Sequence, residues 1–359
     1  MKGVVALDIG SSAIAGVELR TERDGFVRLQ RAAVESIPAG LMRDGEIQDP
    51  EALAQEIKEF WRIGKFAGRK VRLGVANGRV IVRNIDVPAY DDPADVRAAV
   101  EQEAAEQIPT PAEGSIVDFQ PIMRYVDASS VERERCVVVS GHREMLETLT
   151  WTVRKAGLQP VGIDLEAFAI LRAVLPAPAV IDEGSVDSQA VLVCHVGAEV
   201  TNLIVAVDRN CHFTRLVGFG GAQLTREVAE RVELPLPEAE ALKNACGLLG
   251  EPPEDWNKQT VAEVRHALAL GARPLAREIS RSLEFYRSQS LARPVGKIVL
   301  AGGTSLCAGL DRYLQQALGI AVEVGDPRPQ VEGAATLGPE IATRAAVALG
   351  LALDARELS

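Results

Sequence analysis

Short apolar runs that end at glycine recur three times along the chain. The runs at residues 3–6, 190–193 and 297–300 are followed by the glycine-containing segments 7–12, 195–199 and 301–305. An apolar run of this length bounded by glycine is typical of a buried strand that ends in a turn. Because glycine lacks a side chain, such turns let backbone N–H groups come close to phosphate oxygens. The pattern therefore predicts a nucleotide held between two halves of the chain.

The first two of these segments resemble each other. Placing Gly10 on Gly197 superposes residues 5–10 on residues 192–197, and a second apolar run follows each glycine. The two glycines stand about half the chain apart. This spacing favours two related halves, each beginning with a β-turn-β unit. The alternative is a chance likeness between two ordinary hairpins.

Between these segments the pattern predicts an inserted block. Asp92 and Pro93 begin a helix with apolar residues at i, i+4 spacing and acidic residues on its other faces, and strands follow it. We therefore expect domain 1 at residues 1–187, with an inserted α+β subdomain at about residues 86–160.

The second half of the chain is predicted to be richer in helix. A proline-containing linker, residues 176–187, leads into domain 2 at residues 188–359. Helical apolar spacing fills most of the stretch that follows. We expect a helical subdomain at about residues 230–292 and a final helix, residues 341–353, that packs back on domain 1.

Composition narrows the functional classes. The chain has 359 residues, is 47% hydrophobic and carries a net charge of −11. Its length fits a two-domain globular protein. Its charge argues against a nucleic-acid partner or an anionic-membrane binder. No apolar stretch reaches the roughly 18–20 residues of a membrane helix, and the N-terminus enters a strand at once. We expect no direct membrane insertion.

Cysteine and histidine usage points to a cytoplasmic protein without a histidine metal site. The five cysteines are scattered and show no CxxC pair, as is typical of a reducing compartment. His195 and His212 fall on the first and third strands of a predicted meander. Adjacent strands lie about 4.8 Å apart, so a gap of roughly 10 Å is too wide for both imidazoles to bind one metal ion.

The first glycine turn carries candidate phosphate chemistry. Asp8 stands at a strand end two residues before Gly10, and Ser11 and Ser12 follow in the turn. The hydroxyl and N–H groups can reach phosphate oxygens, and the carboxylate can order the water shell of Mg²⁺. The alternative is an Asx-turn that only stabilises the hairpin.

Two further motifs have both a binding and a structural interpretation. Gly220 and Gly221 precede a helix, where N–H groups can meet an anion, but the same pair also suits a tight strand-to-helix crossover. Glu240 and Lys243 lie one helical turn apart. They can close over a nucleoside, or they can form a solvated i, i+3 ion pair.

Taken in order, these pieces resemble the actin-like ATPase superfamily, with its Asp-x-Gly phosphate-1 turn, phosphate-2 turn and late Gly-Gly adenosine turn. Within that superfamily the chain resembles the PilM family of type IV pilus biogenesis proteins, from end to end. The implied fold class is α/β: an actin-like (ribonuclease H-like, duplicated) two-domain fold with an inserted small α+β subdomain of the FtsA/PilM type. The matching segments are residues 7–12, 101–109, 164–169, 219–225, 239–243, 282–286 and 301–304.

The resemblance implies that ATP or ADP binds between the turns, with Mg²⁺ held by Asp8 through water. The family's phosphate-2 turn normally begins with Asp, and His195 stands there instead. A carboxylate is a hard ligand suited to Mg²⁺, whereas imidazole prefers softer metals and is mostly neutral at pH 7. ATP hydrolysis is therefore expected to be slow or absent. The implied nucleotide-binding residues are Asp8, Gly10, Ser11, Ser12, His195, Gly197, Ala198, Glu199, Gly220, Gly221, Glu240, Lys243, Gly302, Gly303, Thr304 and Ser305.

The resemblance also implies a working role and partners. It describes a cytoplasmic adaptor that binds the N-terminal tail of a PilN-like inner-membrane protein. Through this and other pilus assembly components, motor components among them, the adaptor would lie at the inner membrane. The inserted block would border the groove for an extended tail, bound through backbone pairing and apolar pockets.

Three alternatives share the fold. A small-molecule kinase should have a catalytic Asp in its first domain; Asp164 is a weak candidate and is better interpreted as a helix N-cap. An FtsA-like membrane tether would end in a basic amphipathic helix, whereas residues 349–359 are short and acidic. An MreB-like filament scaffold would place its insert earlier in the first domain.

Overall fold

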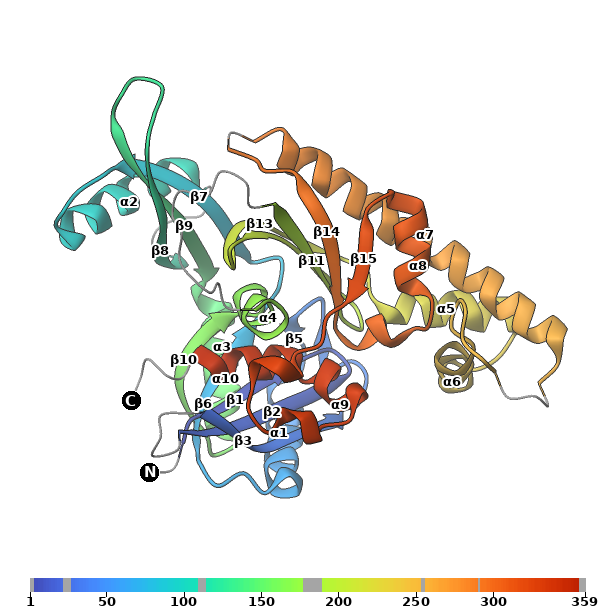
Figure 1. Cartoon of the computed structure of the whole chain (residues 1–359). Helices are drawn as coiled ribbons and strands as arrows, with labels where there is room; N and C mark the ends of the chain where they lie inside the picture. The colour runs from blue at the N-terminus through green and yellow to red at the C-terminus, as the bar shows by residue number, and fades with distance from the viewer. Residues whose placement is uncertain are drawn as a thin grey trace.

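Two five-stranded mixed sheets with the same strand order form the centre of the molecule (Figure 1). The computed structural model describes residues 3–21, 27–108, 114–176, 189–252, 256–289 and 291–354. The predicted linker therefore falls almost wholly outside the described residues, and so does the boundary at residues 187 and 188. The division into two domains stays a prediction.

The first sheet has the order β10-β6-β1-β2-β3. Its strands β10, β6 and β1 run parallel, while β1, β2 and β3 form an antiparallel meander. A short hairpin, β4 Met42–Arg43 with β5 Glu46–Ile47, follows the meander. The strands of the first sheet are β1 Val5–Ile9, β2 Ala13–Thr21, β3 Val27–Ser36, β6 Lys70–Val75 and β10 Gln159–Leu165.

The second sheet repeats this arrangement with the order β13-β12-β11-β14-β15. Here β11, β14 and β15 are parallel, and β11, β12 and β13 form the meander. The shared order and shared strand directions confirm the predicted duplication. The strands are β11 Ala190–Val196, β12 Thr201–Val207, β13 Asn210–Val217, β14 Val295–Ala301 and β15 Ala321–Val324.

Helices cover both faces of the first sheet. On one face lie α1 Pro50–Gly64 and α3 Arg143–Lys155, whose apolar residues share a core with β1 and β6. The Asp49 side chain caps α1 by accepting from the Ala52 N–H at 2.9 Å. On the other face, α4 Glu166–Val174 and α10 Ala346–Asp354 share a core with strands of both sheets.

The predicted final helix is two helices. α9 Pro339–Arg344 ends before Ala345, and α10 begins at Ala346 and packs on β1, β2 and β6. Gly350 permits its close crossing with α4, because a Cβ there would lie 1.8 Å from the Ala169 carbonyl oxygen. The last helix packs on the first sheet as expected, but it begins at Ala346, five residues after the predicted start at residue 341.

The helical part of the second half packs on one face of the second sheet. Its core joins β11, β12 and β14 to one side of the long helix α7. The helices of this part are α5 Gly221–Val232, α6 Leu236–Cys246, α7 Lys258–Arg287 and α8 Leu310–Leu318, with 3-10 turns at Gly303–Leu306, Arg328–Gln330 and Ala334–Thr336.

A third sheet, the insert sheet, has the order β7-β9-β8. It consists of β7 Val80–Pro88, β8 Ser115–Val126 and β9 Glu132–His142, and α2 Pro93–Gln107 packs on it through Val96, Val100 and Ala104. The insert sheet therefore begins before the predicted residue 86. The helix α3, expected within the block, instead belongs to the core of the first sheet because its Leu149 and Val153 pack there.

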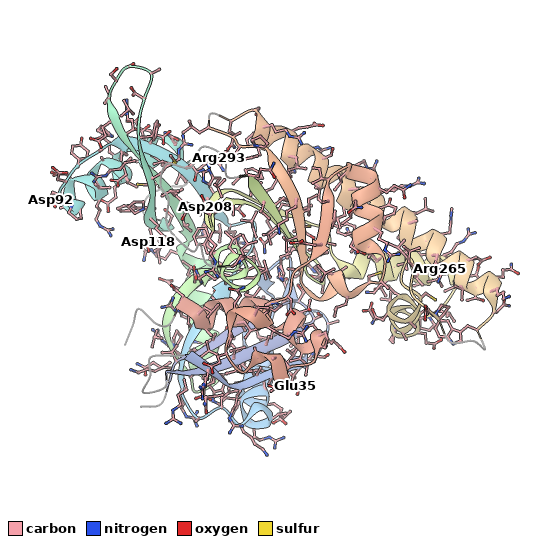
Figure 2. All side chains as sticks on the ribbon, in the orientation of Figure 1. Glu35, Asp92, Asp118, Asp208, Arg265 and Arg293 are labelled. Atoms are coloured by element: carbon pink, nitrogen blue, oxygen red, sulfur yellow. The ribbon has the colours of Figure 1, made fainter. Side chains whose placement is uncertain are left out.

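The insert also contacts the second sheet. The Asn84 side chain on β7 donates to the His212 carbonyl on β13. In Figure 2, Asp208 and Arg293 lie toward the insert, whereas Asp92 and Arg265 lie toward opposite ends of the molecule. Burial, with the nearby positive charges of Arg135 and Arg293, lowers the pKa of His212 to about 4. His212 is therefore a neutral side chain at this contact.

Candidate nucleotide site

The two glycine turns have the same backbone geometry. The Gly10 N–H donates to the Ala13 carbonyl at 2.9 Å, and the Gly197 N–H donates to the Val200 carbonyl at 2.9 Å. Asp8 pairs with Ala15 across β1 and β2, and His195 pairs with Asn202 across β11 and β12. Asp8 and His195 thus hold equivalent positions in the two sheets, as the alignment of Gly10 with Gly197 predicts.

A single cleft of about 970 Å³ lies between the two turns. That volume is in the range of pockets that hold small organic ligands. Twelve of the sixteen predicted residues line it: Asp8, Gly10, Ser11, Ser12, His195, Gly197, Ala198, Gly221, Glu240, Lys243, Gly303 and Thr304. The remaining four, Glu199, Gly220, Gly302 and Ser305, are not among its lining residues.

Two of these four residues support the third glycine turn, residues 301–305, which is called the adenosine turn after its counterpart in the family resemblance. Gly302 has a φ of 83°, and a Cβ there would lie 2.5 Å from the Val196 carbonyl oxygen, so the position requires glycine. The Ser305 hydroxyl donates to the Gly302 carbonyl at 2.7 Å. Thr304, which does line the cleft, donates to the Gly197 carbonyl at 2.8 Å and so ties the adenosine turn to the second glycine turn.

Gly220 and Gly221 form the crossover rather than an anion site. The Gly220 N–H donates to the Gln223 side chain, and the N–H groups of Gly221 and Ala222 donate to the carbonyls of Gly197 and Ala198. A Cβ at Gly220 would lie 2.3 Å from the Ala198 carbonyl oxygen. Because its first N–H groups are already used, the start of α5 has few donors left for phosphate.

Glu199 connects the second glycine turn to the β4–β5 hairpin of the first half. Its carboxylate accepts from the Asp44 N–H, in the β4–β5 hairpin, at 3.1 Å. Asp44 has a φ of 52°, a strained conformation for a non-glycine residue that this acceptor helps to hold. The contribution of Glu199 is therefore a cross-cleft hydrogen bond.

Glu240 and Lys243 form a tight cluster with Thr225 on α5. The Lys243 ammonium donates to the Glu240 carboxylate at 2.6 Å and to the Thr225 hydroxyl at 3.0 Å. Burial raises the pKa of Glu240, but the hydrogen bonds from Lys243 and Thr225 outweigh it and the net direction is down. The carboxylate is thus ionised and partly open to the cleft.

Two carboxyl groups, Asp8 and Glu166, line the cleft and interact electrostatically. Burial raises the pKa of Asp8 to about 7. Burial, with the nearby Asp8 charge, raises the pKa of Glu166 well above its usual value. The Asn202 side-chain amide donates to Glu166 at 3.4 Å from the second sheet. Glu166 also lines the cleft, and in the sequence only its place at a strand end signals this role.

The imidazole of His195 is neutral at its position in the second turn. Burial lowers its pKa to about 4, and its Cδ2 lies against Gly302, where a Cβ would approach to 2.9 Å. Among the residues that the structure describes, no group of three His, Cys, Asp or Glu side chains could hold a metal ion directly. The donor set fits a Mg²⁺ ion bound mainly to phosphate oxygens and water, with Asp8 and Glu166 acting on the water shell.

Asp164 is not part of the cleft. Its carboxylate pairs with Arg172 and accepts from the Leu165 N–H at 2.7 Å, and Leu165, not Asp164, occupies the N-cap position of α4. The N-cap interpretation is therefore wrong in register by one residue. A carboxylate held by a guanidinium outside the cleft is also unsuited to the kinase base that it was weighed for.

Some cleft residues carried no signal in the sequence pattern. Glu340 and Arg344 come from α9, Asn244 from α6 and Leu306 from the adenosine turn. α9 lies far along the chain and reaches the cleft only because it contacts both β3 and the adenosine turn. Long-range packing of this kind leaves no local motif to find.

Comparison with known proteins places the whole chain in one group. A family model described as type IV pilus assembly protein PilM matches residues 6–356. The chain is similar to a solved PilM-PilN type IV pilus biogenesis complex, with a TM-score of 0.79, 29% identity and coverage of 98% of each chain.

Two further likenesses extend across most of the chain. The cell division protein FtsA of Pseudomonas aeruginosa is 25% identical over 370 residues, covering 91% of this chain and 83% of the relative. MreB5 of Spiroplasma citri bound to ADP has a TM-score of 0.55 at 12% identity, covering 99% and 96% of the two chains. At that identity the likeness shows the fold alone, and that fold is the predicted actin-like ATPase fold.

Proposed function

The chain belongs to the PilM family of type IV pilus assembly proteins, and from that premise we propose that it is an adenine-nucleotide-binding adaptor of the pilus assembly machinery. In this proposal it lies in the cytoplasm and captures the N-terminal tail of a PilN-like inner-membrane protein. Through that tail it links the membrane complex to cytoplasmic motor components. The whole-chain similarity to a PilM-PilN complex supports the partner.

The observation that carries nucleotide binding is the pair of equivalent glycine turns that face one cleft. ATP or ADP would lie with its phosphates between Gly10 to Ser12 and Gly197 to Ala198, and its adenosine beside Glu240 and the turn at Gly303 and Thr304. Backbone N–H groups and the serine hydroxyls would bind the phosphates without any need for a positive side chain there. The ADP-bound neighbour with the same fold is consistent with this placement.

Hydrolysis is proposed to be slow or absent. A bound Mg²⁺ would neutralise phosphate charge and orient the phosphates. Asp8 and Glu166 would act on its water, but His195 contributes neither charge nor a hard oxygen ligand. Glu166 lies where it can orient a water near the phosphates, yet burial and the Asp8 charge raise its pKa and so disfavour its ionised form. The cleft is therefore better suited to holding a nucleotide than to turning it over.

Attachment to the membrane would come from the partner. None of the helices in the described ranges is both long and apolar enough to span a bilayer. An N-terminal tail that extends from an inner-membrane protein would supply that link.

The proposed groove for the tail lies where the insert sheet meets the first sheet. β8 and β10 are edge strands with free backbone groups on one side, and α3 contacts β10. The Arg143 side chain at the start of α3 donates to the Ser115 carbonyl at the start of β8 and keeps the two close. Apolar side chains exposed along these elements are Ile116, Val117, Trp151, Val161 and Ile163. An extended peptide fits such an edge through backbone pairing and shallow apolar pockets.

A peptide titration tests the adaptor role. A fluorescent N-terminal tail of a PilN-like protein should bind with a micromolar-range constant, roughly −8 kcal/mol. Ile116→Asp should weaken it about tenfold, about 1.4 kcal/mol. Val126→Asp is the matched control, because Val126 is 66% exposed at the far end of the same strand. Equal binding of a scrambled tail, or equal loss in both variants, would contradict the proposed groove.

A further inference from the structure

Two positively charged side chains line the described part of the cleft, Lys243 on α6 and Arg344 on α9. Both lie close to the adenosine turn. A Cβ at Gly221 would lie 2.5 Å from the Thr304 hydroxyl and 3.5 Å from the Lys243 ammonium, and one at Gly303 would lie 3.6 Å from the Cγ of Arg344. Both cations are therefore within reach of a nucleoside placed on this turn.

The donors of Lys243 are already occupied. Its ammonium has three N–H groups, and the described acceptors are Glu240 at 2.6 Å, Thr225 at 3.0 Å and the Gly221 carbonyl at 3.4 Å. The side chain is 6% exposed. A nucleotide that bonded directly to Lys243 would have to break one of these contacts in a buried site, which is costly. Lys243 instead fixes the carboxylate of Glu240, whose side chain is 46% exposed.

Arg344 is in a different situation. Within the described residues it forms an ion pair with Glu340, one helical turn earlier, at 3.5 Å, and the Glu340 side chain is 72% exposed. That long, solvated pair is weak and uses few of the five N–H groups of the guanidinium. The planar guanidinium also has two faces that can stack on an aromatic ring.

We propose that Arg344 is the cation that contacts the purine base of the bound nucleotide, and that Lys243 is a positioning residue that acts on the ribose only through Glu240. This inference rests on the proposed nucleotide binding and assigns roles within that site. The base stacks against the guanidinium beside Gly303, and the Glu240 carboxylate accepts from the ribose hydroxyls.

One consequence is a contact across the cleft. α9 packs against β3 of the first sheet, whereas Glu240 and the adenosine turn belong to the second half. A nucleoside held by both Arg344 and Glu240 joins the two halves, so its binding should favour the closed arrangement of the cleft.

The experiment separates base contacts from ribose contacts with two probes, ADP and 2′,3′-dideoxy-ADP, titrated by calorimetry. Arg344→Ala should weaken both probes equally, by about tenfold, in line with a desolvated cation–π contact. Arg344→Lys should recover only part of that loss because an ammonium lacks the planar face. Arg312→Ala, at an exposed position on α8, is the control and should bind like the wild type.

The positioning role has its own readout. Lys243→Met should weaken ADP about tenfold and leave dideoxy-ADP unchanged, and it should have no further effect in a Glu240→Gln background. An equal loss for both probes would mean direct contact or damage to the fold and would overturn the role. If Lys243→Met does not fold, Glu240→Gln alone tests the ribose contact. It must weaken the binding of ADP and leave the binding of dideoxy-ADP unchanged.

The failure of this inference is distinguishable from the failure of the proposed function. Wild-type protein that binds no ADP would remove the nucleotide site itself. Wild-type protein that binds ADP, with Arg344→Ala and Arg344→Lys both unchanged, would overturn only the role of Arg344.

Discussion

The turns at Gly10 and Gly197 have the same backbone and opposite chemistry. Both close with an N–H to carbonyl hydrogen bond of 2.9 Å. In each, the residue two positions before the glycine pairs with the equivalent residue of the next strand. The first turn presents Asp8, whose pKa is raised by burial to about 7, and the second presents His195, whose pKa is lowered by burial to about 4. Burial thus pushes both side chains toward their neutral forms.

In the proposed nucleotide site, phosphate binding and metal chemistry depend on different groups and are therefore separable. The donors that hold phosphate are backbone groups, which the glycine turns supply whatever residue precedes them. The proposed metal chemistry depends on side-chain charge, which the neutral His195 does not supply. A duplicated cleft can therefore keep its ligand while its catalytic capacity falls.

The largest effect is expected from blocking the turns themselves. Gly197→Val and Gly303→Val should each abolish calorimetrically detectable ADP binding by filling space meant for phosphate or ribose. Gly303 tolerates a Cβ, 3.6 Å from Arg344, so that variant should fold normally. Gly78→Val is the matched control because nothing lies within 4 Å of a Cβ there. Unaltered affinity in both cleft variants would dispose of the site.

The next effect is on stability against pH, and the two turns should differ in sign. The Asp8 pKa is raised, so its contribution to the free energy of unfolding is full below about pH 4 and is lost as pH rises through about 7. The His195 pKa is lowered, so its contribution is present above about pH 6.5 and is lost as pH falls toward 4. At 1.36 kcal/mol per pKa unit these are up to about 4 and about 3 kcal/mol.

Thermal melts of two variants with non-titrating side chains measure that difference. Asp8→Asn should be more stable than the wild type at pH 8 and lose most of this advantage by pH 4. His195→Asn should lose less stability than the wild type as pH falls from about 6.5 toward 4. Burial of Glu166 acts in the same direction as that of Asp8, so some decline toward high pH should remain in Asp8→Asn. If both substitutions changed the pH dependence of stability in the same direction, the opposite signs assigned to Asp8 and His195 would be wrong.

A smaller effect should come from Glu199, whose side chain reaches from the second turn to the first half. Glu199→Ala removes the acceptor for the Asp44 N–H, an exposed hydrogen bond worth about 1 kcal/mol or less. Hydrogen exchange at Asp44 should speed up a few-fold, while the Ala52 amide, capped by Asp49 in the same half, should not change. No change at Asp44 would mean that the β4–β5 hairpin is held by other contacts.

The parts of this molecule that the sequence predicts are those with local causes. The strand ends at Gly10, Gly197 and Gly302 follow from apolar runs that stop at glycine, and the equivalence of Asp8 with His195 follows from their distance to those glycines. The start of α2 at Asp92 follows from its cap. Each of these features depends on residues that are neighbours in the chain.

The features that local sequence patterns do not predict depend on packing between distant segments. Arg344 reaches the cleft because α9 contacts both β3 and the adenosine turn. The α5 N-terminus is unavailable for phosphate because the carbonyls of Gly197 and Ala198 take its N–H groups. The assignment of α3 to the first-sheet core likewise depends on which sheet its Leu149 and Val153 meet. These contacts cannot be predicted from residues that are neighbours in the chain.

The most direct test is a calorimetric titration of ATP into wild-type protein and His195→Asp, each with Mg²⁺ and with EDTA. The account predicts that the wild type binds ATP with nearly the same affinity in both buffers and hydrolyses it slowly or not at all. His195→Asp adds a third carboxyl group beside Asp8 and Glu166, so it should bind more weakly in EDTA and gain affinity with Mg²⁺. Wild-type protein that needs Mg²⁺ to bind ATP and hydrolyses it briskly would contradict the account.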